Sequence, residues 1–220
     1  MDVKKILSAT DHTLLRPTAG WQEVQTLLDE AMAFGCASAC IPPSYVYEAV
    51  TYVDGNLPIC TVVGFPNGYS TTACKLFETE DALEDGAEEI DMVINLGWVK
   101  DGLWDLVEDE ISQLRDLCDS AILKVIVETS ELTRQEKIHL CQIVSAVGVD
   151  YIKTSTGFAS GGATADDIKL MKAHLGPGVA IKASGGIRTL EDAAHLMEEG
   201  ACRLGASALV KLARPLWPED

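Results

Sequence analysis

Short apolar runs rich in β-branched residues alternate with longer amphipathic segments along the whole chain. The short runs have the length of strands, and the longer segments have the period of helices. Eight such pairs are present, with predicted strands at Ala9–Leu14, Ala37–Pro42, Ile59–Phe65, Glu89–Asn95, Ile122–Glu128, Asp150–Ser155, Val179–Ser184 and Cys202–Ala206. A helix after every strand is typical of βαβ units that share a parallel sheet.

Capping signals at the ends of the predicted helices support this alternation. A threonine followed three residues later by an acidic residue indicates a helix start, and a glycine indicates a helix end. The starts are Thr133 with Glu136, Thr164 with Asp167 and Thr189 with Asp192, and the ends are Gly35, Gly86, Gly148 and Gly200. The uninterrupted series predicts one (β/α)8 TIM-barrel domain over residues 1–220. An open doubly wound sheet is the main alternative, which the lack of a G-x-G-x-x-G turn after the first strand disfavours.

Charged residues fall on the inward face of several predicted strands. Side chains alternate across a strand, so the more apolar set of each strand faces the helices and the other set faces the barrel centre. This parity places Asp91, Lys153 and Lys182 inward, and it also places Lys124 and Glu128 of the fifth strand inward. We therefore expect three lysines and at least two carboxylates in the barrel centre.

Buried charges need partners, and two interpretations explain these. One is a structural ion-pair network. The other is catalysis, because Lys153 and Lys182 have the same phase in consecutive strands, near the carboxyl ends where barrel active sites lie. An amine attacks a carbonyl only when it is deprotonated, and both burial and a second cation lower the pKa of a lysine. Under the catalytic interpretation, the lysine pair supplies a nucleophilic amine and Asp91 carries protons.

Glycine-containing turns follow the last three predicted strands. They are Thr154–Phe158, Ser184–Arg188 and Gly205–Ser207. Loops at this position in a barrel commonly hold phosphate through backbone N–H groups, which glycine leaves accessible. Each turn alone is better explained as a simple tight turn, but the three together favour a phosphate site.

The charge of the chain restricts its partners. Asp and Glu number 34 against 17 Lys and Arg, and the net charge of -17 repels nucleic acid and anionic membrane surfaces. The seven scattered cysteines are typical of reduced thiols and form neither a disulfide pattern nor a zinc motif. No signal peptide or membrane-spanning run is recognisable, so we expect a cytoplasmic protein without membrane contact. A homodimer is expected from the fold class alone.

Five motifs resemble those of the deoxyribose-phosphate aldolase family, and together they span nearly the whole chain. They are Asp11–Leu15, Glu89–Asn95, Lys124–Thr129, Asp150–Phe158 and Ile181–Arg188. The resemblance implies reversible cleavage of 2-deoxy-D-ribose 5-phosphate to D-glyceraldehyde 3-phosphate and acetaldehyde, without a metal or organic cofactor. It implies that Lys153 forms a Schiff base, that Lys182 tunes it and relays protons, and that Asp91 donates and accepts protons. It further implies that Asp11, Cys40 and Lys124 line the sugar site, and that Thr156, Gly157, Gly185, Gly186, Gly205 and Ser207 surround the phosphate.

The chain departs from some members of this family at two places. Ser207 is followed by Ala208 rather than by a second serine, so one hydroxyl contact to the phosphate is absent. The chain ends in Pro215–Asp220 and has no tyrosine there, so a mechanism that uses a tail tyrosine does not apply directly.

Two other functions remain compatible with the residues alone. A phosphosugar isomerase on the same fold shares the phosphate loops but needs no nucleophilic lysine. A catalytically silent binding barrel is expected to have lost Lys153, Lys182 or Asp91, and the chain has all three.

Overall fold

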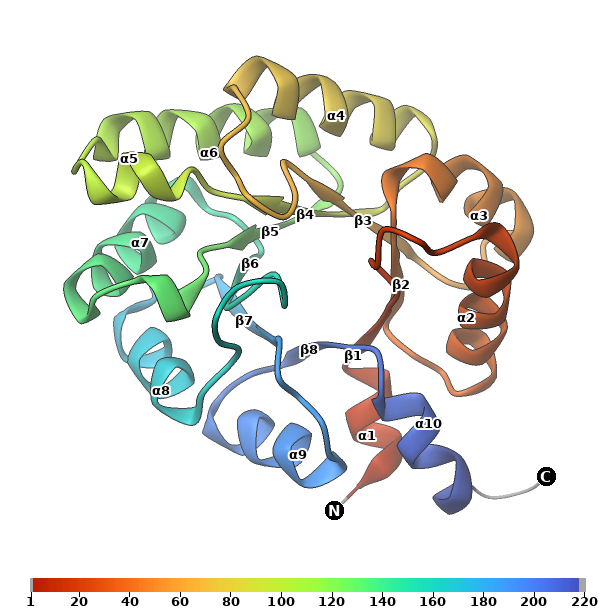
Figure 1. Cartoon of the computed structure of the whole chain (residues 1–220). Coiled ribbons are helices and arrows are strands. Elements are labelled where there is room, and N and C mark those ends of the chain that lie inside the picture. The colour runs from red at the N-terminus through yellow and green to blue at the C-terminus, as the bar shows by residue number, and fades with distance from the viewer. Residues whose placement is uncertain (1, 218–220) are drawn as a thin grey trace.

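The computed structural model describes residues 2–217, whose strands close into a parallel barrel in sequence order (Figure 1). The strands are β1 (Thr10–Thr13), β2 (Ser38–Ile41), β3 (Ile59–Val63), β4 (Glu89–Val93), β5 (Ile122–Ile126), β6 (Tyr151–Lys153), β7 (Ala180–Ser184) and β8 (Arg203–Ala206). Because β1 pairs with both β2 and β8, the predicted TIM barrel is confirmed and the open sheet is wrong.

Helices surround this barrel on its outside (Figure 1). They are α1 (Val3–Ser8), α2 (Trp21–Ala33), α3 (Val46–Val53), α4 (Thr72–Glu84), α5 (Leu96–Lys100), α6 (Trp104–Cys118), α7 (Arg134–Val147), α8 (Ala165–His174), α9 (Leu190–Glu199) and α10 (Leu209–Ala213). The predicted starts at Thr133, Thr164 and Thr189 are confirmed, because each threonine side chain accepts a hydrogen bond from the backbone N–H three residues later. Within residues 2–217, no helix has both the length and the apolar character needed to cross a membrane.

Four strands end two residues earlier than the sequence predicts, namely β3, β4, β5 and β6. After β4, the side chain of Asn95 accepts a hydrogen bond from Trp98 N at 3.3 Å and so begins α5. After β5, Glu128 has a left-handed backbone with φ of 57°, which no strand residue adopts. The prediction that Glu128 points into the barrel from a strand is therefore wrong.

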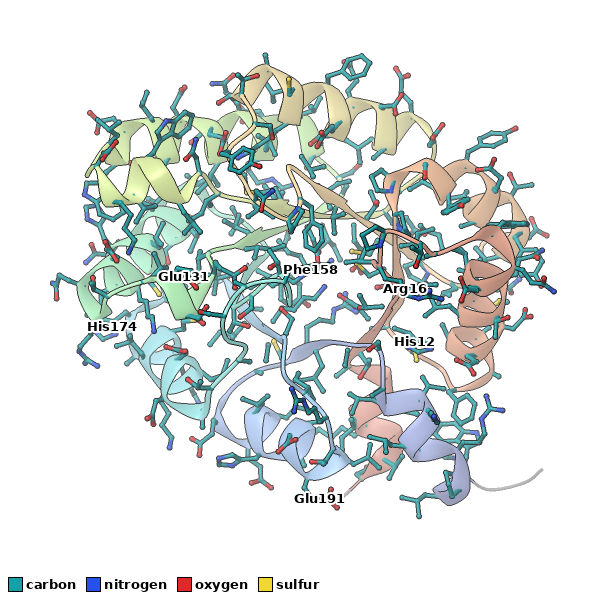
Figure 2. The ribbon with its side chains drawn as sticks, viewed as in Figure 1. His12, Arg16, Glu131, Phe158, His174 and Glu191 are labelled. Atoms are coloured by element: carbon teal, nitrogen blue, oxygen red, sulfur yellow. The ribbon has the colours of Figure 1, made fainter. Side chains whose placement is uncertain are left out.

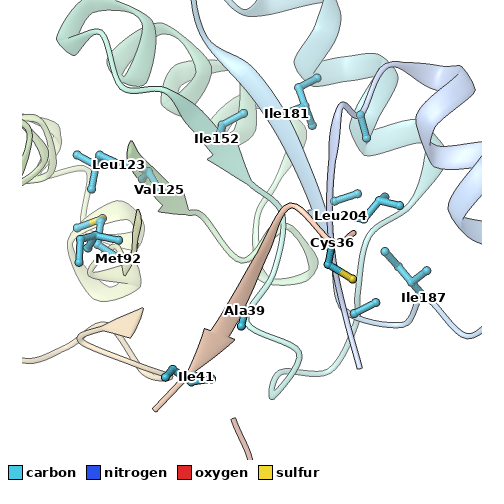
Figure 3. Packing of buried hydrophobic residues seen from close by; sticks show 14 of the residues in the cluster. Cys36, Ala39, Ile41, Met92, Leu123, Val125, Ile152, Ile181, Ile187 and Leu204 are labelled. Carbon is cyan, nitrogen blue, oxygen red and sulfur yellow. The ribbon is translucent and has the colours of Figure 1, made fainter. Parts of the chain in front are cut away.

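An apolar layer fills the space between the barrel and its helices. The outward-facing residues of the strands include Met92, Val125, Ile152, Ile181 and Leu204, and each is at least 95 % buried (Figure 3). Burying such a side chain contributes about 1.5–3 kcal/mol. The apolar outward residues of β4 to β8 thus hold the helices in place, while the charged residues of these strands lie on the inward half.

One ion pair interrupts the apolar layer. Lys75 of α4 and Glu110 of α6 are both fully buried, and Lys75 Nζ lies 2.8 Å from Glu110 Oε2 and 2.7 Å from the carbonyl oxygen of Val93. Burial lowers the pKa of Lys75 and raises that of Glu110. For each residue, the cost of removing the charge from water therefore exceeds the stabilisation from the opposite charge. Neither residue can lose the other without being left as an unpaired buried charge.

We predict that Glu110→Ala lowers the free energy of unfolding by about 3–5 kcal/mol, because it leaves the Lys75 ammonium group buried without a carboxylate. Lys169→Ala is the control, since Lys169 pairs with Glu199 at the surface and its removal should cost at most about 1 kcal/mol. Urea unfolding followed by circular dichroism measures both. A cost for Glu110→Ala as small as that of the control would contradict the prediction.

Candidate active site

The predicted inward lysines lie inside the barrel on neighbouring strands. Lys153 of β6 and Lys182 of β7 are directly paired in the register of the sheet, and Asp91 of β4 is paired with Lys124 of β5. Lys124, Lys182 and Asp91 are fully buried, and Lys153 is 3 % exposed. The parity of the sequence therefore correctly brings these four residues together.

Asp91 is the centre of this cluster. Its Oδ2 atom accepts hydrogen bonds from Lys153 Nζ at 2.7 Å and from Lys182 Nζ at 2.6 Å, and its Oδ1 atom accepts one from Lys124 Nζ at 2.8 Å. Burial favours the neutral acid, but the positive charges of Lys124, Lys153 and Lys182 outweigh it and hold the pKa of Asp91 well below 3.8. Asp91 is thus an anion that three ammonium groups share.

A second layer of charge lies beside the first. Lys124 Nζ is 2.6 Å from Glu89 Oε2, and Arg203 joins Glu89 at 2.6 Å and Asp11 at 3.3 Å. Asp11 also forms an ion pair with Lys182. Our sequence reasoning did not single out Glu89 or Arg203, although Glu89 has the same strand parity as Asp91 and Arg203 has that of Gly205.

The electrostatics of the lysine pair differ from the simple repulsion that the sequence suggests. Burial lowers the pKa of Lys182, but the carboxylates of Asp11 and Asp91 outweigh burial and raise it above 10.5. Lys182 is therefore a fixed cation at neutral pH. It faces Lys153 across a shared carboxylate oxygen, and this anion offsets part of the repulsion between the two lysines.

A cavity of about 300 Å³ opens at the carboxyl ends of the strands. Loops after β1, β6, β7 and β8 line it, and Lys153 is the member of the charged cluster that reaches it. The predicted phosphate residues that line this cavity are Thr156, Gly157, Gly185, Gly186, Gly205 and Ser207. Asp11, Cys40, Lys124, Asp91 and Lys182 lie deeper and are not part of its wall.

Glu128 contacts the phosphate loop rather than the charged cluster. Its Oε2 atom accepts hydrogen bonds from Thr156 N at 3.1 Å and from Thr156 Oγ1 at 2.6 Å. The hydroxyl oxygen of Thr156 in turn accepts a hydrogen bond from Phe158 N. Glu128 therefore fixes the start of the loop after β6 and occupies two donors that the sequence suggested for the phosphate.

Two groups of side chains in the described chain have the spacing of metal ligands. They are Cys40, Cys60 and Asp91, and Asp11, Cys60 and Glu89. Lys124 Nζ lies 3.3 Å from Cys60 Sγ and contacts the carboxylates of both groups. An ammonium group thus already lies among these ligands, so the donor set does not match a metal centre.

The structure combines a closed barrel with a buried lysine that reaches a cavity at the carboxyl ends of its strands, beside a carboxylate and a second lysine. These features define the lysine-dependent class of barrel aldolases. The chain belongs to the DeoC/LacD family of aldolases, whose model matches residues 5–212.

Individual relatives agree with this assignment. The chain is 58% identical over 214 residues to a deoxyribose-phosphate aldolase of Streptococcus pyogenes, a match that covers 97% of this chain and 96% of the relative. A crystal structure of a putative deoxyribose-phosphate aldolase from Coccidioides immitis is 40% identical and matches with a TM-score of 0.95, covering 98% of this chain and 87% of that one. The tetrameric deoxyribose phosphate aldolase from Aeropyrum pernix is 30% identical, with a TM-score of 0.91 and coverage of 98% and 92%.

The depressed pKa of Asp91 predicts how acid affects stability. The stabilisation from this carboxylate is complete above 3.8, its ordinary pKa, and is lost as the pH falls from there through the lower pKa of the folded state. We expect the free energy of unfolding to fall more steeply below about pH 4 in the parent protein than in Asp91→Asn, which binds no proton at this position.

Urea unfolding at several pH values between about 3 and 6 measures this slope. Asp116→Asn is the control, because Asp116 is exposed on α6 and should keep the slope of the parent protein. Equal slopes in the parent and in Asp91→Asn would show that the carboxylate is not held ionised by its lysine neighbours.

Proposed function

We propose that this chain reversibly cleaves 2-deoxy-D-ribose 5-phosphate to D-glyceraldehyde 3-phosphate and acetaldehyde through a Schiff base on Lys153. The observation that carries the proposal is that the buried Lys153 side chain reaches the cavity while its Nζ atom lies 2.7 Å from Asp91 Oδ2. The amine thus meets a substrate on one side and a proton carrier on the other. The family membership supports the same chemistry.

The reaction follows from these positions. The unprotonated Lys153 amine attacks the C1 aldehyde of the open sugar, and loss of water gives a protonated imine. A base then removes the proton of the C3 hydroxyl, the C2–C3 bond breaks, and its electrons pass to the imine as an enamine. D-Glyceraldehyde 3-phosphate leaves, C2 takes up a proton, and water releases acetaldehyde and the free amine. Asp91 is proposed to carry protons to and from Lys153, and the fixed positive charge of Lys182 to disfavour the ammonium form of Lys153.

The cavity supports the proposed position of the substrate. We assign the phosphate to the end formed by Thr156, Gly157, Gly185, Gly186, Gly205 and Ser207, where glycine allows the backbone to approach closely. Asp11, Cys40 and Lys124 lie beneath the cavity. We propose that they border the sugar site from below, where Asp11 and Lys124 keep Asp91 and Lys182 in place through their ion pairs.

The proposal includes a cytoplasmic location and a homodimeric state. All seven cysteines are free thiols, which favours the reducing cytoplasm. Large apolar side chains are exposed on the helices, among them Tyr47, Phe77 and Leu106, and such side chains favour association of copies into a homodimer.

We predict that acetaldehyde and sodium borohydride together inactivate the protein irreversibly, because borohydride reduces the imine to a stable secondary amine. Peptide mass mapping should locate an added ethyl group on Lys153. Lys153→Arg should abolish both the labelling and the turnover while the barrel stays folded, because the guanidinium group keeps a positive charge near Asp91 and forms no imine. Turnover at the parental rate in Lys153→Arg would refute the assignment of Lys153 as the Schiff-base lysine.

Lys182→Leu should cut the turnover rate sharply and move the pH optimum upward. The fixed positive charge of Lys182 beside Asp91 disfavours a second ammonium ion at Lys153. Without Lys182, a higher pH should be needed to form the neutral amine. The pH profile of kcat/KM measures the shift, with Lys172→Leu on the outer surface of α8 as the control. A slower variant with an unchanged pH profile would remove the proposed electrostatic role of Lys182.

A further inference from the structure

The cavity contains few basic groups that match a phosphate. Among the described residues that line it, the basic side chains are Lys153 and Arg16. Lys153 is bound to Asp91 and is needed for the carbonyl carbon at the other end of the substrate. Arg16, which follows β1, is therefore the basic side chain that remains for the phosphate.

The neutral donors of the phosphate loops are fewer than the sequence suggests. Glu128 already accepts the hydrogen bonds of Thr156 N and Thr156 Oγ1, and Ala208 supplies no hydroxyl beside Ser207. A phosphate monoester carries close to two negative charges, and the chain as a whole carries -17. A local cation is needed to offset this repulsion, and the planar guanidinium group of arginine matches phosphate oxygens with paired donors.

The ion pair between Arg16 and Glu23 is easily broken. Arg16 forms an ion pair with Glu23 near the start of α2 and donates to Thr18 Oγ1 at 3.1 Å. The Arg16 and Glu23 side chains are 49% and 48% exposed, and ion pairs this exposed contribute little to stability. Glu23 also accepts a hydrogen bond from Gly20 N at 3.1 Å, so it still caps α2 when Arg16 leaves.

The backbone near Arg16 is anchored, and its side chain has free space around it. The segment that carries it is anchored by the hydrogen bond from Leu14 N to the carbonyl oxygen of Cys40 at 2.9 Å. Arg16 and Ser207 line both the substrate cavity and a neighbouring cavity of about 260 Å³ that contains Glu23. Figure 2 shows Arg16 near the barrel opening, between α2 and the loop that carries Phe158. The side chain thus points toward Glu23 and has space to turn toward the phosphate loops.

We propose that Arg16 leaves Glu23 and binds the phosphate of the sugar, and that it thereby sets the preference for a phosphorylated over an unphosphorylated substrate. This inference rests on the proposed function. It makes Arg16 a specificity-determining residue on the wall of the cavity that also contains the glycine turn after β6.

The test compares two substrates, 2-deoxy-D-ribose 5-phosphate and 2-deoxy-D-ribose, in the parent protein and its variants. Arg16→Ala should lower the ratio of kcat/KM for the phosphorylated to the unphosphorylated sugar roughly 10- to 100-fold, mainly through KM, because a hydrogen-bonded charge pair is lost. Arg16→Lys should restore part of the ratio, since it keeps the charge without the paired donors. Glu23→Gln should not lower the ratio, because it releases Arg16.

Arg134→Ala is the matched control, since Arg134 is exposed at the start of α7 on the same end of the barrel and does not line the cavity. This variant should keep the parental ratio. An unchanged ratio in Arg16→Ala, or an equal loss of activity with both substrates, would overturn the inference while leaving the proposed aldolase function intact. A parent protein that cleaves neither sugar would overturn both.

Discussion

The lysine cluster of this site depends on one buried carboxylate that three ammonium groups share. Removing Asp91 and the lysines from water is costly, and the cost is met only because the closed barrel holds oppositely charged atoms within hydrogen-bonding distance. The charged groups of the ion-pair cluster around Asp91 are Lys124, Lys153, Lys182 and Arg203 against Asp11, Glu89 and Asp91, or four against three. The charges balance when one lysine is neutral, which is the form that attacks a carbonyl.

The outward and inward faces of the strands differ in the side chains that they carry. The outward face carries the apolar side chains that bind the helices, and the inward face carries the charges. A substitution on the inward face therefore changes chemistry without removing much of the apolar layer. The exception is the pair of Lys75 and Glu110, which brings charge into the outer layer and binds the end of β4 through the carbonyl oxygen of Val93.

Sequence periodicity predicted the barrel and the lysine cluster because both follow from local rules. A strand repeats every two residues, so the inward position of Lys182 fixes that of Ser184 and needs no knowledge of distant parts. The same rule failed at Glu128, because a left-handed residue ends the strand before it and redirects the side chain to Thr156. The contacts of Arg203 and the place of Arg16 on the cavity wall depend on how β8 and the loop after β1 meet distant strands, and no local pattern contains that information.

Closure of the ring also has a consequence for the order in which the site forms. Asp11 lies on the first strand and meets Arg203 of the last strand at 3.3 Å, because β1 and β8 are neighbours (Figure 1). During synthesis, the carboxylate of Asp11 leaves the ribosome nearly a full chain length before the guanidinium group of Arg203, which is one of its basic partners. The charged interior is therefore completed only when the last strand arrives, and a shortened chain leaves an acid at its centre without this basic partner.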